Sequence, residues 1–158
     1  MNTKTTLTLA ASHLIVAAMG FAGGIYTLPI LIAPKAPTAQ EVKASSAQGQ
    51  FTATFKRNLK DSDALHWGEG AVSIGPRTIS LAGKLSPGPD YKLYLSPEFV
   101  ETESDFKRQK PAMVLVGDVK TFDNFVVSVP AGIDPAKYAA VIVWCETFNE
   151  FITAAKYR

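Results

Sequence analysis

The sequence predicts an all-β fold, an antiparallel β-sandwich or barrel-like domain that follows an N-terminal transmembrane helix. Residues 7–34 are apolar and contain no Asp, Glu, Lys or Arg. From residue 51 onward, short runs of alternating apolar and polar residues are separated by turn-forming Gly, Pro, Asn and Asp. A chain of 158 residues has room for one compact domain beside such a segment. We therefore divide the chain into a signal anchor or transmembrane segment (1–34), a linker (35–50) and a β domain (51–158).

The apolar stretch from Leu7 to Pro34 predicts a helix that crosses a membrane. It is longer than the about 20 residues that a helix needs to span a bilayer, and longer than the roughly 7 to 15 apolar residues of a cleaved signal peptide. No clear small-x-small cleavage site follows it. We expect an uncleaved signal anchor, with cleavage as the alternative. The charge bias that sets orientation is weak, because Lys4 precedes the span and Lys35 follows it.

The segment 35–50 is rich in Ala, Pro, Ser and Gln and has neither helical nor strand periodicity, which is typical of a linker. This linker separates the anchor from a domain that we place outside the cytoplasm, in a bacterial periplasm or at the cell exterior. Cleavage of the anchor would instead release a secreted protein.

The first strands of the domain are indicated by two-residue alternation. The run "FTATF" places Phe51, Ala53 and Phe55 on one face. The run "SIGPRTISL" has Gly75-Pro76 between two strand-like halves and predicts a hairpin. The next strand, "YKLYLS", ends before Pro97, and its apolar side consists of Tyr91, Leu93 and Leu95.

The second half of the domain begins with the most charged stretch of the chain. The run "EFVETESDFKRQKPA" has neither apolar period, so we expect a solvated loop that holds at most one helical turn. A short apolar strand and a strand with Phe125, Val127 and Val129 inward follow. Asp134-Pro135 indicates a helical turn. The runs "AAVIVWCETF" and "EFITAAKYR" are then the last two strands.

Charge and motifs exclude several classes of function. From Phe51 onward thirteen Lys and Arg balance thirteen Asp and Glu, so the domain lacks the basic surface needed for binding nucleic acid. No G-x-x-x-x-G-K, G-x-G-x-x-G or His-x-x-x-His occurs in the domain, and no cofactor or metal site is evident. The sequence has no nucleophile elbow, so it gives no support to a hydrolase. One cysteine cannot form an intramolecular disulfide, so the fold depends on its apolar core.

Four stretches resemble the DM-thirteen domain family. They are "HWGEGAVSI", "GPDYKLYLSP", "GDVKTFDNFVVSVPAGIDPAKYAAVIVWC" and the final "FITAA", and together they cover roughly residues 49–158. The Gly-Pro-Asp before the central strand and the Trp-Cys in "VIVWC" are the most specific. The resemblance implies a β-rich extracytoplasmic domain of the kind that accompanies DOMON domains and membrane cytochromes, with Cys145 as the matching cysteine that takes part in electron transfer. The neighbouring redox domains of those larger proteins do not occur in this sequence.

Strand parity places Cys145 in the core. In a regular strand Val141, Val143 and Cys145 share one face, while Trp144 and Glu146 share the other. Because an unpaired carboxylate is costly to bury, the face with Glu146 is expected to open to solvent at that end. A buried thiol has a raised pKa and behaves as a small apolar group. A redox role for Cys145 therefore needs a strand irregularity or a nearby His, Lys or Arg.

His66 is the only histidine of the domain and lies beside Trp67. A pair of Cys145 and His66 could bind copper or iron, or lower the pKa of the thiol, although nothing in their spacing brings them together. We interpret Trp67 and Trp144 as core residues and not as platforms for a cofactor. We interpret Asp90, which follows Gly88-Pro89, as a turn residue.

Two functions follow from these observations. The first is a membrane-anchored module for redox or electron transfer through Cys145 with a redox protein as partner. The second is a non-catalytic envelope module for binding or interaction, in which Cys145 only packs the core. Neither of the two is a conventional enzyme, and the sequence carries no signal for the oligomeric state.

Overall fold

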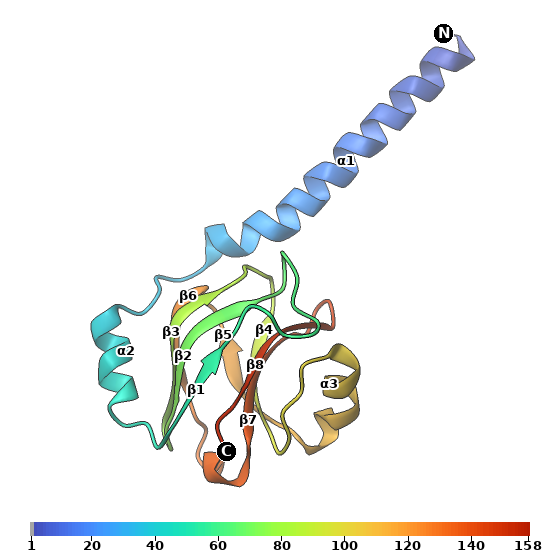
Figure 1. The fold of residues 1–158 in the computed structure, drawn as a ribbon. Coiled ribbons are helices and arrows are strands. Elements are labelled where there is room, and N and C mark those ends of the chain that lie inside the picture. Colours follow the sequence, from blue (N-terminus) through green and yellow to red (C-terminus); the bar gives the residue numbers. More distant parts are fainter. Residues whose placement is uncertain (1) are drawn as a thin grey trace.

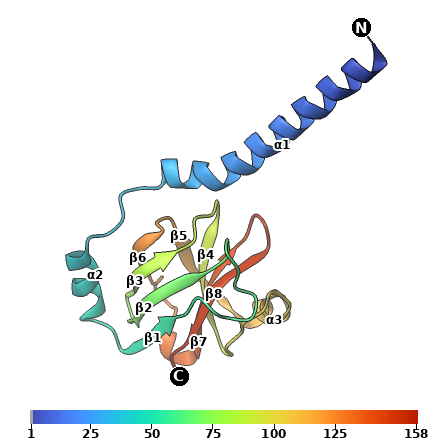
Figure 2. The same cartoon turned by 45° about the horizontal axis from the view of Figure 1, so that its top comes forward.

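The computed structural model describes residues 2–158 and consists of two β-sheets packed face to face (Figure 1 and Figure 2). Neighbouring strands in both sheets are antiparallel, which confirms the predicted all-β sandwich. The first sheet has the order β1 (Phe51–Phe55), β2 (Gly68–Ile74), β3 (Thr78–Leu85), β6 (Asp123–Ser128). The second has the order β5 (Val114–Val119), β4 (Tyr91–Ser96), β7 (Ala140–Cys145), β8 (Glu150–Lys156).

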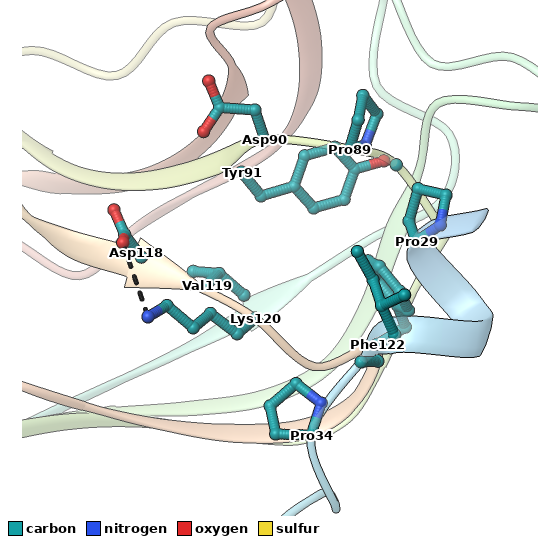
Figure 3. A pocket seen from close by; sticks show the side chains of 12 residues that line it. Pro29, Pro34, Pro89, Asp90, Tyr91, Asp118, Val119, Lys120 and Phe122 are labelled. Carbon is teal, nitrogen blue, oxygen red and sulfur yellow. Dashed lines mark ion pairs between the residues drawn. The ribbon is translucent and has the colours of Figure 1, made fainter. Parts of the chain in front are cut away.

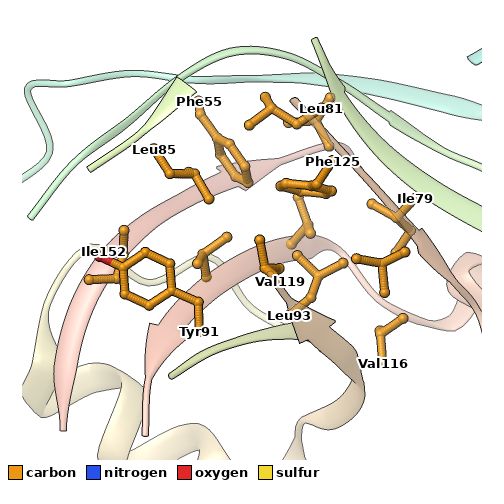
Figure 4. Packing of buried hydrophobic residues seen from close by; sticks show 14 of the residues in the cluster. Phe55, Ile79, Leu81, Leu85, Tyr91, Leu93, Val116, Val119, Phe125 and Ile152 are labelled. Carbon is orange, nitrogen blue, oxygen red and sulfur yellow. The ribbon is translucent and has the colours of Figure 1, made fainter. Parts of the chain in front are cut away.

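The core lies between the two sheets, where side chains at alternate strand positions meet (Figure 4). Ile79 and Leu81 of β3 are fully buried there. Tyr91, Leu93 and Leu95 of β4, which alternation places on one side, all belong to this cluster. Removing each large apolar side chain from water contributes about 1.5 to 3 kcal/mol, so this layer is the main source of stability.

The predicted turns are confirmed where Pro or Gly marks them. The β2–β3 hairpin is closed by a hydrogen bond from the Gly75 N–H to the Thr78 carbonyl, 2.9 Å long. The 3-10 helix η2 (Pro135–Lys137) begins at the predicted Asp134-Pro135 pair, and the Asp134 side chain accepts a hydrogen bond from the Ala136 N–H.

The charged stretch after β4 forms α3 (Glu103–Gln109) and the 3-10 helix η1 (Lys110–Ala112), where the sequence predicts a solvated loop. Thr102 caps α3 by accepting a hydrogen bond from the Asp105 N–H. Phe106 is fully buried, and its ring stacks on Trp144 with 3.9 Å between the centroids. The prediction fails because Phe106 is the one buried residue of α3, and a single apolar residue among charged ones gives no helical periodicity in the sequence.

This packing also changes the environment of Glu146, which was expected to face open solvent. Lys110 Nζ lies 2.7 Å from a carboxylate oxygen of Glu146, and the Tyr94 hydroxyl donates a hydrogen bond to the same carboxylate. The Glu146 side chain is only 25% exposed. Burial opposes its ionisation, but the bonds from Lys110 and Tyr94 outweigh burial and lower the pKa of Glu146. The expectation of open solvent was therefore wrong, because α3 and η1 supply a covering layer with a basic partner.

The helix α2 (Ala39–Ser46) lies within the segment expected to be a linker without periodic structure. Thr38 and Glu41 form a reciprocal capping box at its start. Val42 is buried on the outer face of the first sheet, and the Ser45 hydroxyl donates to the Thr78 hydroxyl at 2.9 Å. One buried residue in eight gives no apolar stripe, which is why the sequence pattern missed this helix.

The apolar N-terminal segment forms α1 (Thr3–Ile32), which projects away from the sandwich in both views (Figure 1 and Figure 2). By length and composition α1 is able to cross a membrane. Pro29, near its C-terminal end, is the one residue of α1 that is buried against the rest of the chain. Most of the helix is therefore free of the domain, while its last turns touch it.

Candidate functional site

Cys145 is the last residue of β7, and its backbone pairs with Tyr91 on β4 and with Glu150 on β8. Its side chain lies on the inner face with Val141 and Val143 and is 2% exposed. The inward direction predicted from strand parity is confirmed. The ladder between β7 and β8 shifts register just before Cys145, between Val143 and Trp144. The shift leaves Ile152 of β8 without a partner residue on β7, so the irregularity lies in the neighbouring strand and the Cys145 side chain stays buried.

Cys145 is one of the residues that line a pocket. This pocket has a volume of about 340 Å³ and lies between the domain and residues 22–26 of α1. It is mainly apolar, and most of its few polar side chains come from the domain, while Tyr26 comes from α1. The residues that line it are Ala22, Ile25, Tyr26, Leu65, His66, Pro87, Gly88, Pro89, Tyr91, Cys145, Phe148, Glu150 and Ile152. We call it the Cys145 pocket.

The Cys145 thiol is protonated at neutral pH. Burial raises the pKa of the thiol above its usual value, and the nearby backbone of Phe148, Asp90 and Thr147 offsets only part of this rise. Because burial is the largest of these influences, the thiol keeps its proton, and a protonated thiol is a weak nucleophile.

His66 lies in the same pocket as Cys145, which their spacing in the sequence does not reveal. The His66 Nδ1 atom lies 3.0 Å from an Asp63 carboxylate oxygen, and the Asp63 carboxylate also accepts the backbone N–H groups of Leu65 and His66. A proton held between Nδ1 and Asp63 leaves Nε2 as the free nitrogen of the ring. Within residues 2–158, no cluster of three or more metal-ligating side chains accompanies the pair.

Two further polar side chains of the pocket are absent from the residues that the sequence singles out for chemistry. Tyr91 is 3% exposed, and burial raises the pKa of its hydroxyl, which stays protonated. Burial also raises the pKa of Glu150, with a further contribution from nearby Glu103. The register of the last hairpin could have identified Glu150, because Cys145 and Glu150 are direct cross-strand partners.

A smaller pocket of about 280 Å³ shares Tyr91 with the Cys145 pocket and lies against the end of α1 (Figure 3). Pro29 of α1 lies close to Tyr91 and Phe122 in this view, and the two aromatic rings pack edge to face with centroids 5.9 Å apart. At its rim Lys92 Nζ bridges Asp90 and Asp118 at 2.9 Å and 2.8 Å. The pocket is thus a junction between α1 and the domain, closed by an ion-pair network.

Asp90 has the structural role that the sequence indicates. Its carboxylate accepts a hydrogen bond from the Thr147 hydroxyl, and its backbone carbonyl accepts the Glu146 N–H. These bonds attach the β7–β8 turn to the start of β4. Asp90 therefore fixes the loop next to Cys145 and is itself held by Lys92.

The family model for the electron transfer DM13 domain matches residues 50–157. The chain belongs to this family. The match covers both sheets and includes Cys145 and the part of the Cys145 pocket that the domain contributes, whereas the wall from α1 lies outside it. It confirms the resemblance that "GPDYKLYLSP" and "VIVWC" indicate. No match was found among curated proteins or among solved structures.

The DM13 domain of this chain can support a restricted kind of thiol chemistry. Cys145 is the one cysteine in 158 residues, so a disulfide at this site needs a thiol from another molecule. His66 and Glu150 are the groups in the pocket that can accept a proton from a thiol that enters the reaction.

Proposed function

We propose that this chain is a membrane-anchored DM13 module that takes part in redox or electron transfer through Cys145 with a partner on the extracytoplasmic side. The observation that carries the proposal is the position of Cys145 on the wall of an open pocket that also holds His66. A cysteine used only for packing has no need of a pocket beside its sulfur. Membership of the electron transfer DM13 family supports the same role.

The reaction that we propose is the reversible formation of a mixed disulfide. Cys145 and a thiol of the partner each lose their S–H proton, one S–S bond forms, and two electrons pass to the disulfide or other two-electron acceptor that the partner brings. Return of two electrons and two protons restores both thiols. Because the resting thiol is protonated, the partner or a change in the pocket must first lower its pKa.

The anchor in this proposal is α1, kept in the mature protein. Its length and composition support a membrane span, and the contact of Pro29 with the domain supports a helix that stays attached.

The test is thiol labelling of the full chain in detergent, with a small maleimide, with and without denaturant. We expect Cys145 of the native protein to be labelled much faster than the domain unfolds, because the pocket admits a small reagent. The same protein incubated with oxidised glutathione should form a mixed disulfide at Cys145 that intact mass measures and Cys145→Ala abolishes. Labelling that occurs only after denaturant unfolds the domain would contradict the proposal.

The second candidate is a non-catalytic binding or interaction module in which Cys145 packs the core. The 2% exposure of Cys145 and its raised pKa favour this candidate. It predicts that native labelling requires unfolding, so the same measurement separates the two functions.

A further inference from the structure

Two parts of the chain line the Cys145 pocket: the helix α1, which is able to cross a membrane, and the β domain. Ala22, Ile25 and Tyr26 contribute one wall from α1, and the domain contributes the other. Leu65 and Phe148, on two loops of the domain, line the pocket and yet are 56% and 45% exposed. Large apolar side chains that remain exposed around an apolar pocket mark a surface for an apolar ligand.

The length of α1 places this pocket at the surface of the bilayer. At 1.5 Å per residue the 30 residues of α1 extend about 45 Å, whereas the hydrocarbon core is about 30 Å thick and takes about 20 residues. The uncharged apolar stretch begins at Leu7, so a span of about 20 residues that starts there ends near Tyr26, with Ala22 and Ile25 at the edge of the hydrocarbon core. Tyr26 then lies in the interfacial layer, where tyrosine is enriched.

The size and polarity of the pocket limit its ligand. A volume of about 340 Å³ is near the lower end of the roughly 300 to 1,000 Å³ typical of small-molecule sites, so it holds a ring or a short length of chain and not an entire lipid. The Tyr91 hydroxyl and the His66 ring are polar groups that can fix an oxygen atom of the ligand.

We propose that the Cys145 pocket binds a lipid-soluble molecule that enters from the bilayer, with its apolar part against Ala22 and Leu65 and an oxygen atom bonded by Tyr91 or His66. Fatty acids and membrane quinones share this chemistry. The inference rests on the proposed membrane anchoring by α1. The bilayer would then supply a small ligand to the same pocket at which the partner protein reacts with Cys145.

The experiment uses the full chain in phosphatidylcholine nanodiscs with two photoreactive probes, an azido-ubiquinone and a diazirine-labelled palmitate. Intact mass first establishes that α1 is present. Peptide mapping after irradiation should locate at least one probe on Leu65, Phe148 or Ile152, and excess of the matching unlabelled compound should remove the adduct. The probe that labels these residues identifies the source of the ligand.

Matched variants on α1 test the geometry. Ala22→Phe fills the pocket from the helix side and should reduce labelling of the domain at least fivefold, whereas Ala18→Phe, one turn earlier and outside the pocket, should leave it unchanged. Cys145→Ala should still be labelled, because binding does not need the thiol.

The outcomes separate this inference from the proposed function. Absence of domain labelling by both probes in protein that retains α1, or equal labelling of Ala22→Phe and the unaltered chain, would overturn the lipid site and leave the thiol test unaffected. Labelling in a protein whose Cys145 fails the native thiol test would keep the lipid site and remove the redox role.

Discussion

Cys145 combines two properties that usually exclude one another. Its sulfur is buried and protonated, as in an inert core cysteine, and it also lines a pocket with His66 and Glu150. The raised pKa controls the fraction of thiolate, and the pocket controls access of a reagent. These two factors can be measured separately, because only the first depends on pH.

The pH dependence of labelling at Cys145 follows from the direction of its pKa shift. Because burial raises the pKa, the thiolate fraction is small at neutral pH and should grow roughly tenfold for each pH unit below the pKa. We expect the maleimide labelling rate of the native protein to rise continuously above neutral pH and to level off at a higher pH than for the unfolded chain. The reference is the same protein in denaturant. A native rate that levels off at a lower pH than in the unfolded chain would show a stabilised thiolate and contradict this assignment.

At the scale of the elements, the aromatic ring of Phe106 attaches α3 to the second sheet. Phe106 lies between Tyr94, whose ring it meets edge to face, and Trp144, on which it stacks. Trp144 directly precedes Cys145 in β7, so this contact supports the back of the strand that carries the thiol.

Replacing Phe106 tests the contribution of this contact. Phe106→Ala should destabilise the domain by about 3 to 5 kcal/mol, because it removes a fully buried ring and leaves a cavity over Trp144. Urea unfolding of the full chain in detergent, followed by tryptophan fluorescence, measures the change. Phe99→Ala is the matched control, since Phe99 is 37% exposed and should cost much less. Equal losses for the two variants would show that α3 is not fastened through Phe106.

The sequence predicts the elements whose stability comes from period-two alternation. Both sheets, the Gly75-Pro76 hairpin and the inward direction of Cys145 belong to this group. It does not predict α2 or α3, because Val42 and Phe106 are single anchors within polar segments. The meeting of His66 and Cys145 could not be predicted either, since it depends on how a long loop folds over the end of the second sheet.

At the scale of the whole molecule, several contacts hold the long apolar helix α1 and the segment after it against the neutral sandwich. Pro29 contacts the domain directly. After the end of α1, the Asn124 side-chain amide donates a hydrogen bond to the Pro37 carbonyl at 3.2 Å. The segment between anchor and domain is therefore held against the first sheet and does not act as a free spacer.

Retention of α1 can be tested on expressed protein. We expect the full chain to remain in the membrane fraction after an alkaline carbonate wash, and its intact mass to include residues of α1, because the helix is long enough to span the bilayer. A variant without residues 2–33 should be found outside the membrane fraction. A mature mass that begins after α1 would instead establish a cleaved signal peptide and a secreted domain.

The docking of α2 on the first sheet limits how far the domain can move from the end of α1. Only the six residues 33–38 separate α1 from α2, and fully extended they reach at most about 20 Å. In the membrane-anchored form that we propose, such a short tether keeps the thiol near the bilayer surface and raises its effective concentration toward molecules confined to the same surface. Encounter with a partner then becomes a search in two dimensions, in which a soluble competitor of equal intrinsic affinity is at a disadvantage.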